Sequence, residues 1–264
     1  MYGSEFEDPV VQYYDETVGK SSQIEIKFYL SKVKKYKGPV LDIACGTGRI
    51  SLLIAREGFN VVSLDRSEGM LSRFKKKLKK ESVEVKRRIT ILNESMSNFR
   101  VDKKFNTILC VDAFFHNLSN NDSFNCLKCV KNHLTPEGRF IFNVHNPNTA
   151  FLDKCIQSKG TQWNIREKYP LNESKGSVLM EEALDADIKK QLIFTKLRFT
   201  RFDTKDRIIE IKESKWTTRY MYKEEYLDLF EKSDLEVENL VGNYKNEPVS
   251  PTSQLIFQIK LKTR

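Results

Sequence analysis

The chain has 264 residues, of which 39% are hydrophobic and 31% are charged, and it carries a formal net charge of +9. This composition is typical of a globular protein and unlike that of a disordered chain. No stretch approaches the roughly 20 consecutive apolar residues of a membrane-spanning helix, and residues 1–8 are acidic without the apolar core of a secretion signal. We therefore expect a cytoplasmic protein with no membrane partner.

We expect residues 8–35 to be helical, with Ile24, Phe28, Tyr29 and Val33 forming an apolar stripe. Between residues 39 and 144, short apolar runs alternate with segments of helical periodicity. The predicted strands are Pro39–Ala44, Asn60–Leu64, Ile89–Leu92, Phe105–Val111 and Gly138–Val144. The predicted helices are Ile50–Glu57, Glu68–Lys80 and Asp122–His133. This alternation indicates βαβ units on a parallel sheet that is covered on both faces.

After Pro147 the pattern changes to longer extended segments that are separated by turn residues. The expected strands of this part are Val178–Leu184, Gln191–Phe202 and Arg207–Tyr220. A helix over Lys223–Glu231 and two strands over Leu235–Leu240 and Gln254–Leu261 are predicted to follow. The sequence therefore predicts one α/β domain with an antiparallel insert, whose last strands return to the edge of the main sheet.

The five cysteines are odd in number and scattered, which favours reduced, buried thiols over a disulfide framework. Cys126 and Cys129 have the spacing of zinc ligands, but no second pair of cysteines or histidines accompanies them. They also fall within a predicted helix. We therefore predict no metal site.

Much of the positive charge lies in local runs of lysine, of which residues 75–80 form the largest. This run continues a helical pattern in which Met70, Leu71, Phe74 and Leu78 share one face. The lysines then occupy the solvent side of the helix. A solvated helix face is favoured here over a groove for RNA, so a nucleic-acid partner is possible but not favoured.

The most informative segment is residues 40–49, Val-Leu-Asp-Ile-Ala-Cys-Gly-Thr-Gly-Arg, which reads as a strand, a tight turn and the start of a helix. A dinucleotide fold would have a third glycine at the position of Ser51. A phosphate-binding P-loop would have Lys after the last glycine, where this chain has Arg49. Neither nucleotide motif is therefore complete.

Two acidic residues distinguish this turn from a cradle for phosphate. Asp42 precedes the turn by two residues and can face a cation, directly or through water. Asp65 ends the second predicted strand, where a carboxylate can accept hydrogen bonds from both hydroxyls of a ribose. A ligand with a ribose, a cationic amino-acid end and no phosphate fits these positions, and S-adenosylmethionine is such a ligand.

With these residues the sequence resembles the class I S-adenosylmethionine-dependent methyltransferases, of the small-molecule type with an antiparallel β insert. The resemblance extends from about Tyr13 to Leu261. It implies a Rossmann-like three-layer α/β sandwich with a mostly parallel seven-stranded sheet, and an antiparallel insert before the final helix and strands. It further implies S-adenosyl-L-methionine as the cofactor and a monomer or homodimer as the assembly.

The resemblance also divides the chain into four parts. Residues 1–35 would form a helical lid segment and residues 36–148 the cofactor-binding core. Residues 149–221 would form the antiparallel insert, as a cover for the substrate. Residues 222–264 would supply the last helix and the two edge strands that complete the main sheet.

Several cofactor-binding residues are implied by position in this resemblance. Ala44, Gly46 and Gly48 would lie under the methionine part of the cofactor. Asp65 would bind the ribose, and Arg66 would border the adenine. The remaining expected cofactor contacts are Asp42, Ser95, Met96, Val111 and Tyr14.

Three of these contacts have specific expectations. Met96 matches the apolar residue that lies under the adenine ring in the family, whereas Ser95 stands where the family has an acid. The Ser95 hydroxyl can still accept one hydrogen bond. The Tyr13-Tyr14 pair resembles a segment that folds over the cofactor, although packing onto the domain explains these aromatic residues equally well.

Two histidines follow strands whose ends face the substrate in the resembling family. His116 comes after the fourth strand and His145 after the fifth. Either imidazole is a candidate to orient the substrate or to take a proton from it. Structural roles are the alternative for both. His133, at a predicted helix end, is interpreted as a favourable partner of the helix dipole.

The insert favours a small-molecule methyl acceptor, with transfer to nitrogen or oxygen. Amino-methylating DNA enzymes carry an acid or asparagine before Pro-Pro-aromatic after the fourth strand, where this chain reads Val111-Asp112-Ala113-Phe114. Cys110 lies within a predicted strand and not in the Pro-Cys pair of cytosine-carbon methylation. An RNA methyltransferase, or an RNA-binding protein on the same scaffold, is the second hypothesis, and a nicotinamide oxidoreductase is the third.

Overall fold

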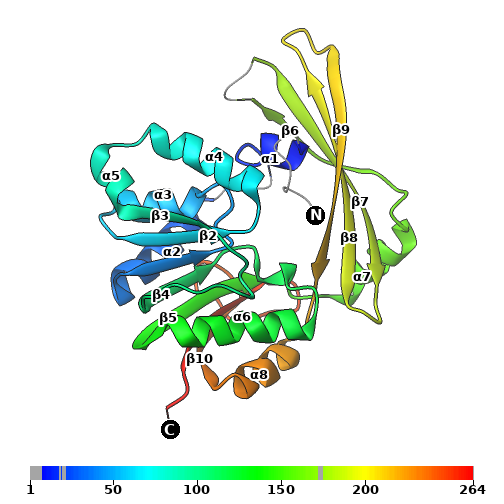
Figure 1. Cartoon of the computed structure of the whole chain (residues 1–264). Coiled ribbons are helices and arrows are strands. Elements are labelled where there is room, and N and C mark those ends of the chain that lie inside the picture. Colours follow the sequence, from blue (N-terminus) through cyan, green and yellow to red (C-terminus); the bar gives the residue numbers. More distant parts are fainter. Residues whose placement is uncertain (1–7, 18, 20–21, 172–174, 264) are drawn as a thin grey trace.

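The computed structural model describes residues 8–17, 19, 22–171 and 175–263 and contains a seven-stranded and a four-stranded sheet (Figure 1). The seven-stranded sheet has the order β3-β2-β1-β4-β5-β11-β10. Its strands are β1 Val40–Ile43, β2 Val61–Asp65, β3 Ile89–Asn93, β4 Phe105–Cys110, β5 Leu134–Val144, β10 Leu235–Val241 and β11 Leu255–Leu261. Strands β1 to β5 pair in parallel, while β11 runs antiparallel to both β5 and β10. The predicted α/β architecture with a mostly parallel seven-stranded sheet is confirmed.

Helices cover both faces of this sheet and produce three layers. Their bounds are α2 Gln23–Tyr36, α3 Arg49–Arg56, α4 Glu68–Lys79, α5 Val83–Arg88, α6 Asn120–His133 and α8 Lys223–Lys232. Helices α2, α3 and α5 contribute to the apolar core on one face, and α6 and α8 to the core on the other. Val40 and Leu41 of β1 are buried in opposite cores, so both faces of this strand are covered.

The insert is a separate antiparallel sheet with the order β6-β7-β8-β9. Its strands are β6 Asn164–Pro170, β7 Ser177–Asp187, β8 Leu192–Phe202 and β9 Ile208–Arg219. Helix α7, Thr149–Ser158, precedes it and packs on β7. Figure 1 shows the long strands of this sheet beside the main domain, with α1, Pro9–Tyr13, near α4 and β9. An antiparallel insert before the final helix and strands is thus observed.

The chain before α2 differs from the prediction of one helix over residues 8–35. Two helices form, because the side chain of Asp8 caps the N–H of Val10 at 2.8 Å and that of Ser22 caps the N–H of Glu25 at 3.1 Å. Each cap starts a new helix, so α1 and α2 are separate elements.

Two further helices were not predicted. Helix α5 has six residues and one buried side chain, Val85, so its sequence shows little apolar periodicity. Helix α7 lies in the insert, where only strands were predicted, and begins where Asn148 caps the N–H of Phe151 at 2.9 Å. Among the helices that the structure describes, none has the length and apolar character to cross a membrane.

Candidate functional site

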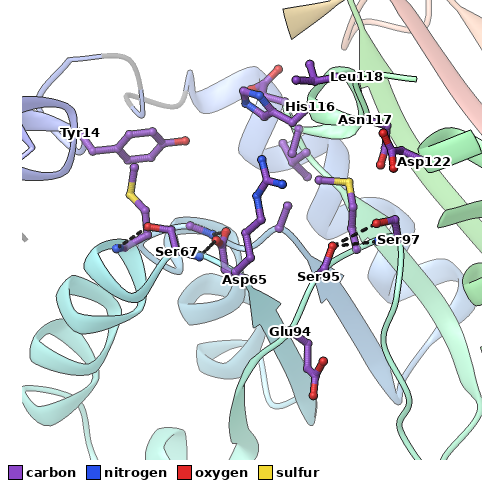
Figure 2. Close-up of a pocket in the computed structure, with 18 residues that line it drawn as sticks. Tyr14, Asp65, Ser67, Glu94, Ser95, Ser97, His116, Asn117, Leu118 and Asp122 are labelled. Atoms are coloured by element: carbon purple, nitrogen blue, oxygen red, sulfur yellow. Dashed lines mark hydrogen bonds between the residues drawn. The ribbon is translucent and has the colours of Figure 1, made fainter. Parts of the chain in front are cut away.

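A pocket of about 180 Å³ opens at the carboxyl ends of β1, β2 and β4 (Figure 2). This edge of a parallel sheet is where α/β proteins bind ligands. Residues from the turn after β1, from the ends of β2 and β3, from the loop after β4 and from the N-terminal segment line it. Eight predicted cofactor contacts are among them: Tyr14, Ala44, Gly46, Asp65, Arg66, Ser95, Met96 and Val111.

The turn after β1 has a left-handed backbone at Ala44, Gly46 and Gly48, with φ angles of 55°, 55° and 74°. At Gly46 an added Cβ would lie 3.9 Å from the hydroxyl of Tyr14, so the glycine keeps the space between turn and phenol open. At Gly48 an added Cβ would lie 2.3 Å from the ring of Phe74. Gly48 therefore allows α4 to pack on the turn, and it is not among the residues lining the pocket.

The carboxylate of Asp65 is fixed at the floor of the pocket by two backbone donors. Its Oδ2 accepts from the N–H of Gly46 at 2.8 Å, and its Oδ1 accepts from the N–H of Ser67 at 2.8 Å. Burial raises the pKa of Asp65, while these two hydrogen bonds act in the opposite direction. Each oxygen keeps a further lone pair, so the carboxylate can still accept hydroxyl donors from a ligand.

Asp42 does not line the pocket, contrary to its predicted contact there. Its side chain is 2% exposed and accepts a hydrogen bond from the hydroxyl of Ser51, which in turn accepts from Ser63 at 2.8 Å. Burial raises the pKa of Asp42 to about 6. The residue that replaces the third glycine of a dinucleotide motif thus supplies the donor that holds Asp42 between α3 and the sheet.

Ser95 and Met96 lie in a tight turn after β3. The Ser95 hydroxyl lies 3.1 Å from that of Ser97 and accepts from the Ser97 N–H at 3.4 Å, as the dashed lines in Figure 2 show. Met96 is 9% exposed and belongs to the apolar core as well as to the pocket. Both residues therefore stand at the pocket, and their contacts with adenine stay predictions.

A charged network that the sequence reasoning missed joins this pocket to the rest of the domain. The guanidinium of Arg49 pairs with Glu25 at 2.6 Å and with Asp112 at 2.9 Å. Asp112 lines the pocket in a left-handed conformation, φ 51°, and its N–H donates to the side chain of Asn143 at 2.9 Å. Tyr29 donates to the same oxygen of Asn143 at 2.9 Å. The sequence signal was the arginine directly after the glycine turn.

Tyr14 closes one side of the pocket, opposite Asp122 in Figure 2. Burial raises the pKa of its phenol to about 12, with Arg49 acting in the opposite direction. The hydroxyl therefore keeps its proton at neutral pH and can donate a hydrogen bond to a ligand. Asp15 fixes this segment to the domain, because its carboxylate accepts from Thr47 at 2.6 Å and from Lys77 at 2.8 Å.

His116 lines the pocket at the end of a short 3-10 helix, η1 Phe114–His116, and hydrogen-bonds to the backbone of Thr217 on β9. Burial, with a smaller contribution from the nearby Arg66, lowers the pKa of its imidazole to about 4. The ring is therefore neutral at physiological pH. It can offer a nitrogen lone pair to a ligand, but it does not retain a proton there.

The two other histidines lie elsewhere. His145 is exposed, stacks on Phe115 with ring centroids 5.2 Å apart, and is not among the residues lining the pocket. His133 accepts from the N–H of Val101 at 3.0 Å through Nε2, so its Nδ1 carries the proton, 2.7 Å from the carbonyl of Cys129. His133 thus lies in the last turn of α6 and contacts one of its terminal carbonyls, as expected for a favourable partner of the helix dipole.

Comparison with known proteins finds similarity to methyltransferases. A family model described as a methyltransferase domain matches residues 40–138. The putative methyltransferase YqeM of Bacillus subtilis (strain 168) is 31% identical over 53% of this chain and 59% of its own length. The glycine/sarcosine N-methyltransferase of Aphanothece halophytica is 27% identical over 61% of this chain and 62% of its own length. The chain thus spans less than two thirds of these curated relatives.

Solved structures show the same fold over the whole chain. An S-adenosylmethionine-dependent methyltransferase from Clostridium acetobutylicum ATCC 824 is similar with a TM-score of 0.76 and 20% identity, covering 98% of this chain and 100% of that one. The CcbJ methyltransferase from Streptomyces caelestis is similar with a TM-score of 0.81 and 16% identity, covering 100% of both chains. At these identities the likeness concerns the fold.

Proposed function

We propose that this chain is a class I S-adenosylmethionine-dependent methyltransferase, which transfers a methyl group from S-adenosylmethionine to a nitrogen or oxygen nucleophile of a small molecule. The observation that carries the proposal is the pocket in which the left-handed turn at Gly46 meets the carboxylate of Asp65. The pocket lies at the edge of the parallel sheet where α/β proteins bind ligands.

The residues of the pocket fit the parts of S-adenosylmethionine. Asp65 presents two acceptor oxygens for the ribose hydroxyls, and a carboxylate at this place would repel a phosphate. Met96 offers an apolar surface for the adenine, with Ser95 as a polar neighbour. At the other end Tyr14 presents a protonated phenol as a donor for the carboxylate of the methionine part.

The sulfonium of the cofactor supplies a methyl carbon that is already activated for displacement. The protein then needs to align the nucleophile and exclude water. Tyr14 and the segment around it close the pocket. The neutral imidazole of His116 accepts a hydrogen bond from an N–H or O–H of the acceptor and orients its lone pair toward the methyl group.

The charges of the pocket favour an amine among small-molecule acceptors. Four carboxylates, from Asp65, Glu94, Asp112 and Asp122, line it together with the single basic residue Arg66. A negative lining attracts cationic ligands and disfavours anionic ones. An amine that reaches the pocket as an ammonium ion, and releases one proton to solvent before its lone pair attacks the methyl carbon, is therefore favoured over a carboxylate or a phosphorylated acceptor.

An RNA acceptor is the second candidate, and the distribution of charge favours it. Residues 75–88 contain eight basic and two acidic side chains, against a net charge of +9 for the whole chain. Lys75, Lys76, Lys79, Lys86 and Arg87 are exposed and form no ion pair with any residue that the structure describes. An RNA-binding surface of this kind would lose affinity steeply with salt, whereas turnover of a small molecule would not.

The proposal is tested by native mass spectrometry of the purified protein, followed by a methyl-transfer screen against amines, amino sugars and tRNA. We expect a copurified cofactor or its demethylated product, and transfer to an amine. Calorimetry with S-adenosylhomocysteine and with NADH in parallel separates a methyltransferase from a nicotinamide oxidoreductase. Binding of NADH alone would overturn the proposal.

A further inference from the structure

A second cavity, of about 410 Å³, lies between the N-terminal segment, helix α4 and the insert sheet. Tyr13 lines this cavity, while its neighbour Tyr14 lines the cofactor pocket, so one short segment borders both spaces. In Figure 1 the same segment lies near α4 and β9. A ligand in the second cavity would therefore contact the segment that closes the first.

Arg201 on β8 is the notable group of this cavity. Its Nε is buried without a hydrogen-bond partner, and its guanidinium forms no hydrogen bond or ion pair with any residue that the structure describes. Leaving a buried donor of a charged group unsatisfied costs free energy, roughly 1–3 kcal/mol or more. An anion in the cavity would satisfy this guanidinium.

Glu16 is the complementary group in the same cavity. Its Oε2 is buried without a hydrogen bond, and the nearest cation, Arg73, lies 3.8 Å away. The cavity thus presents one unsatisfied donor, on Arg201, and one unsatisfied acceptor, on Glu16. A ligand that carries both an anionic group and a hydrogen-bond donor would satisfy both.

The remaining charges of the cavity are paired. Lys212 pairs with Glu210 at 3.0 Å, and Arg73 lies 3.5 Å from Asp15. Among the described residues, three basic and two acidic side chains therefore line the cavity. Glu210 stands opposite Arg201 in the β8–β9 register but pairs with Lys212, and Arg201 itself forms no ion pair with a described residue. This balance suits a small ligand with a single oxyanion group, which a guanidinium can bind through two parallel hydrogen bonds.

We propose that this second cavity binds a small metabolite with an oxyanion group, a carboxylate or a phosphate ester, and a hydroxyl or ammonium donor. The oxyanion lies on Arg201 and the donor on Glu16. Binding there stabilises the closed position of the N-terminal segment, in which Tyr14 lies against the turn at Gly46 and Asp15 bonds to Thr47. Binding of the metabolite then strengthens binding of the cofactor, and binding of the cofactor strengthens binding of the metabolite by the same factor. This coupling rests on the function proposed above.

Direct binding is tested on the full chain by the thermal unfolding midpoint, with four probes at matched ionic strength. Acetate and inorganic phosphate supply the oxyanion alone, and glycolate and glycerol 3-phosphate add a hydroxyl. We expect the midpoint to rise most with one of the two hydroxylated probes. Comparison of glycolate with glycerol 3-phosphate then shows whether the oxyanion is a carboxylate or a phosphate. Failure of all four probes to raise the midpoint beyond sodium chloride contradicts the site.

Two variants and a control test whether the rise in the unfolding midpoint comes from binding in this cavity. Arg201→Gln should abolish the rise in the unfolding midpoint. Arg207→Gln should preserve it, because Arg207 is an exposed arginine in the turn between β8 and β9 and pairs with Asp203. With Glu16→Gln, the hydroxylated probes should raise the unfolding midpoint no more than acetate or phosphate does. This second variant keeps the test decisive if the Arg201 variant does not fold. An equal response of wild type and a folded Arg201→Gln variant overturns the proposal.

The coupling is measured by calorimetry with S-adenosylhomocysteine, with and without the probe that binds best. We expect the affinity to rise roughly fivefold with the probe, at the lower end of typical allosteric coupling. An unchanged affinity contradicts the coupling. Absence of any binding of S-adenosylhomocysteine contradicts the proposed function, while the unfolding midpoints still decide on the second site.

Discussion

The histidines of this chain show how surroundings determine what one residue type can do. His133 is locked as a neutral cross-link between a helix carbonyl and the N–H of Val101. His116 is neutral because burial lowers its pKa to about 4. A pKa this low makes His116 a hydrogen-bond acceptor at the pocket and excludes it as the final holder of a proton at neutral pH.

We predict that His116→Ala lowers kcat without weakening the binding of S-adenosylhomocysteine, because we propose that the imidazole contacts the acceptor and not the cofactor. The wild-type kcat profile should show no ionisation near pH 6.5, the ordinary pKa of histidine. Steady-state kinetics and calorimetry check both statements. A profile with an ionisation near pH 6.5 that the variant lacks would identify His116 as a proton acceptor instead.

The same shift predicts how stability responds to acid. The pKa of His116 is lower in the folded chain, about 4, than its ordinary value of 6.5, so the unfolded chain binds more protons between these values. The stabilising contribution is complete above pH 6.5 and is lost as the pH falls toward 4. Urea unfolding of wild type and His116→Ala should show a smaller acid loss in the variant.

Asp42 predicts the opposite pH dependence. Burial raises its pKa from 3.8 to about 6, so the folded chain binds more protons between these values and the contribution of Asp42 falls as the pH rises from about 4 to 7. The free energy of unfolding of Asp42→Asn, measured in urea over this range, should therefore fall less than that of wild type. Parallel curves for the two proteins would contradict a raised pKa.

At the scale of elements, the N-terminal segment is held by apolar packing against the insert and by charged hydrogen bonds to the main domain. Its α1 residues Val10 and Val11 pack against the insert sheet, and Asp15 bonds to Thr47 and Lys77 of the main domain. Loss of the Asp15 carboxylate removes both bonds at once and leaves Lys77, a partly buried cation, with fewer partners. The segment should then open more often.

We predict that Asp15→Ala weakens the binding of S-adenosylhomocysteine several-fold and accelerates cleavage by chymotrypsin after Tyr13 or Tyr14. Coupling between a closing segment and a ligand is typically about 1–3 kcal/mol. Calorimetry and timed proteolysis measure the two effects. Asp153→Ala, an exposed position on α7, is the matched control, and equal behaviour of the two variants would show that the segment does not close the pocket.

Elements with strong periodicity were predictable from the sequence, and short or capped ones were not. Helices α4 and α6 end at or near their predicted residues because their apolar faces recur every three to four positions. Helix α5 buries a single residue, Val85, and α7 is set by the cap at Asn148, so neither has a clear apolar stripe. The break between α1 and α2 depends on caps within one long helical pattern.

At the scale of the molecule, the parts of the site that lie at the ends of neighbouring parallel strands could be predicted from the sequence. Asp65 and Gly46 follow adjacent strands, so parallel pairing of β1 and β2 brings them together at 2.8 Å. The arginine after the glycine turn is visible in the sequence, but no spacing identifies Glu25 and Asp112 as its partners, because the pairing joins three separate elements. The inward direction of Asp42 depends on the hydroxyl of Ser51, which the motif alone does not reveal.

The central claim, a cofactor pocket in which Asp65 binds the ribose, is tested most directly by calorimetry with S-adenosylhomocysteine. Asp65→Ala should weaken binding by roughly tenfold or more, about 1.4 kcal/mol per factor of ten, while Asp102→Ala, at an exposed loop position, should bind like wild type. Thermal unfolding of both variants verifies that they are folded. A folded Asp65→Ala protein with unchanged affinity would contradict the assignment of this pocket to the cofactor.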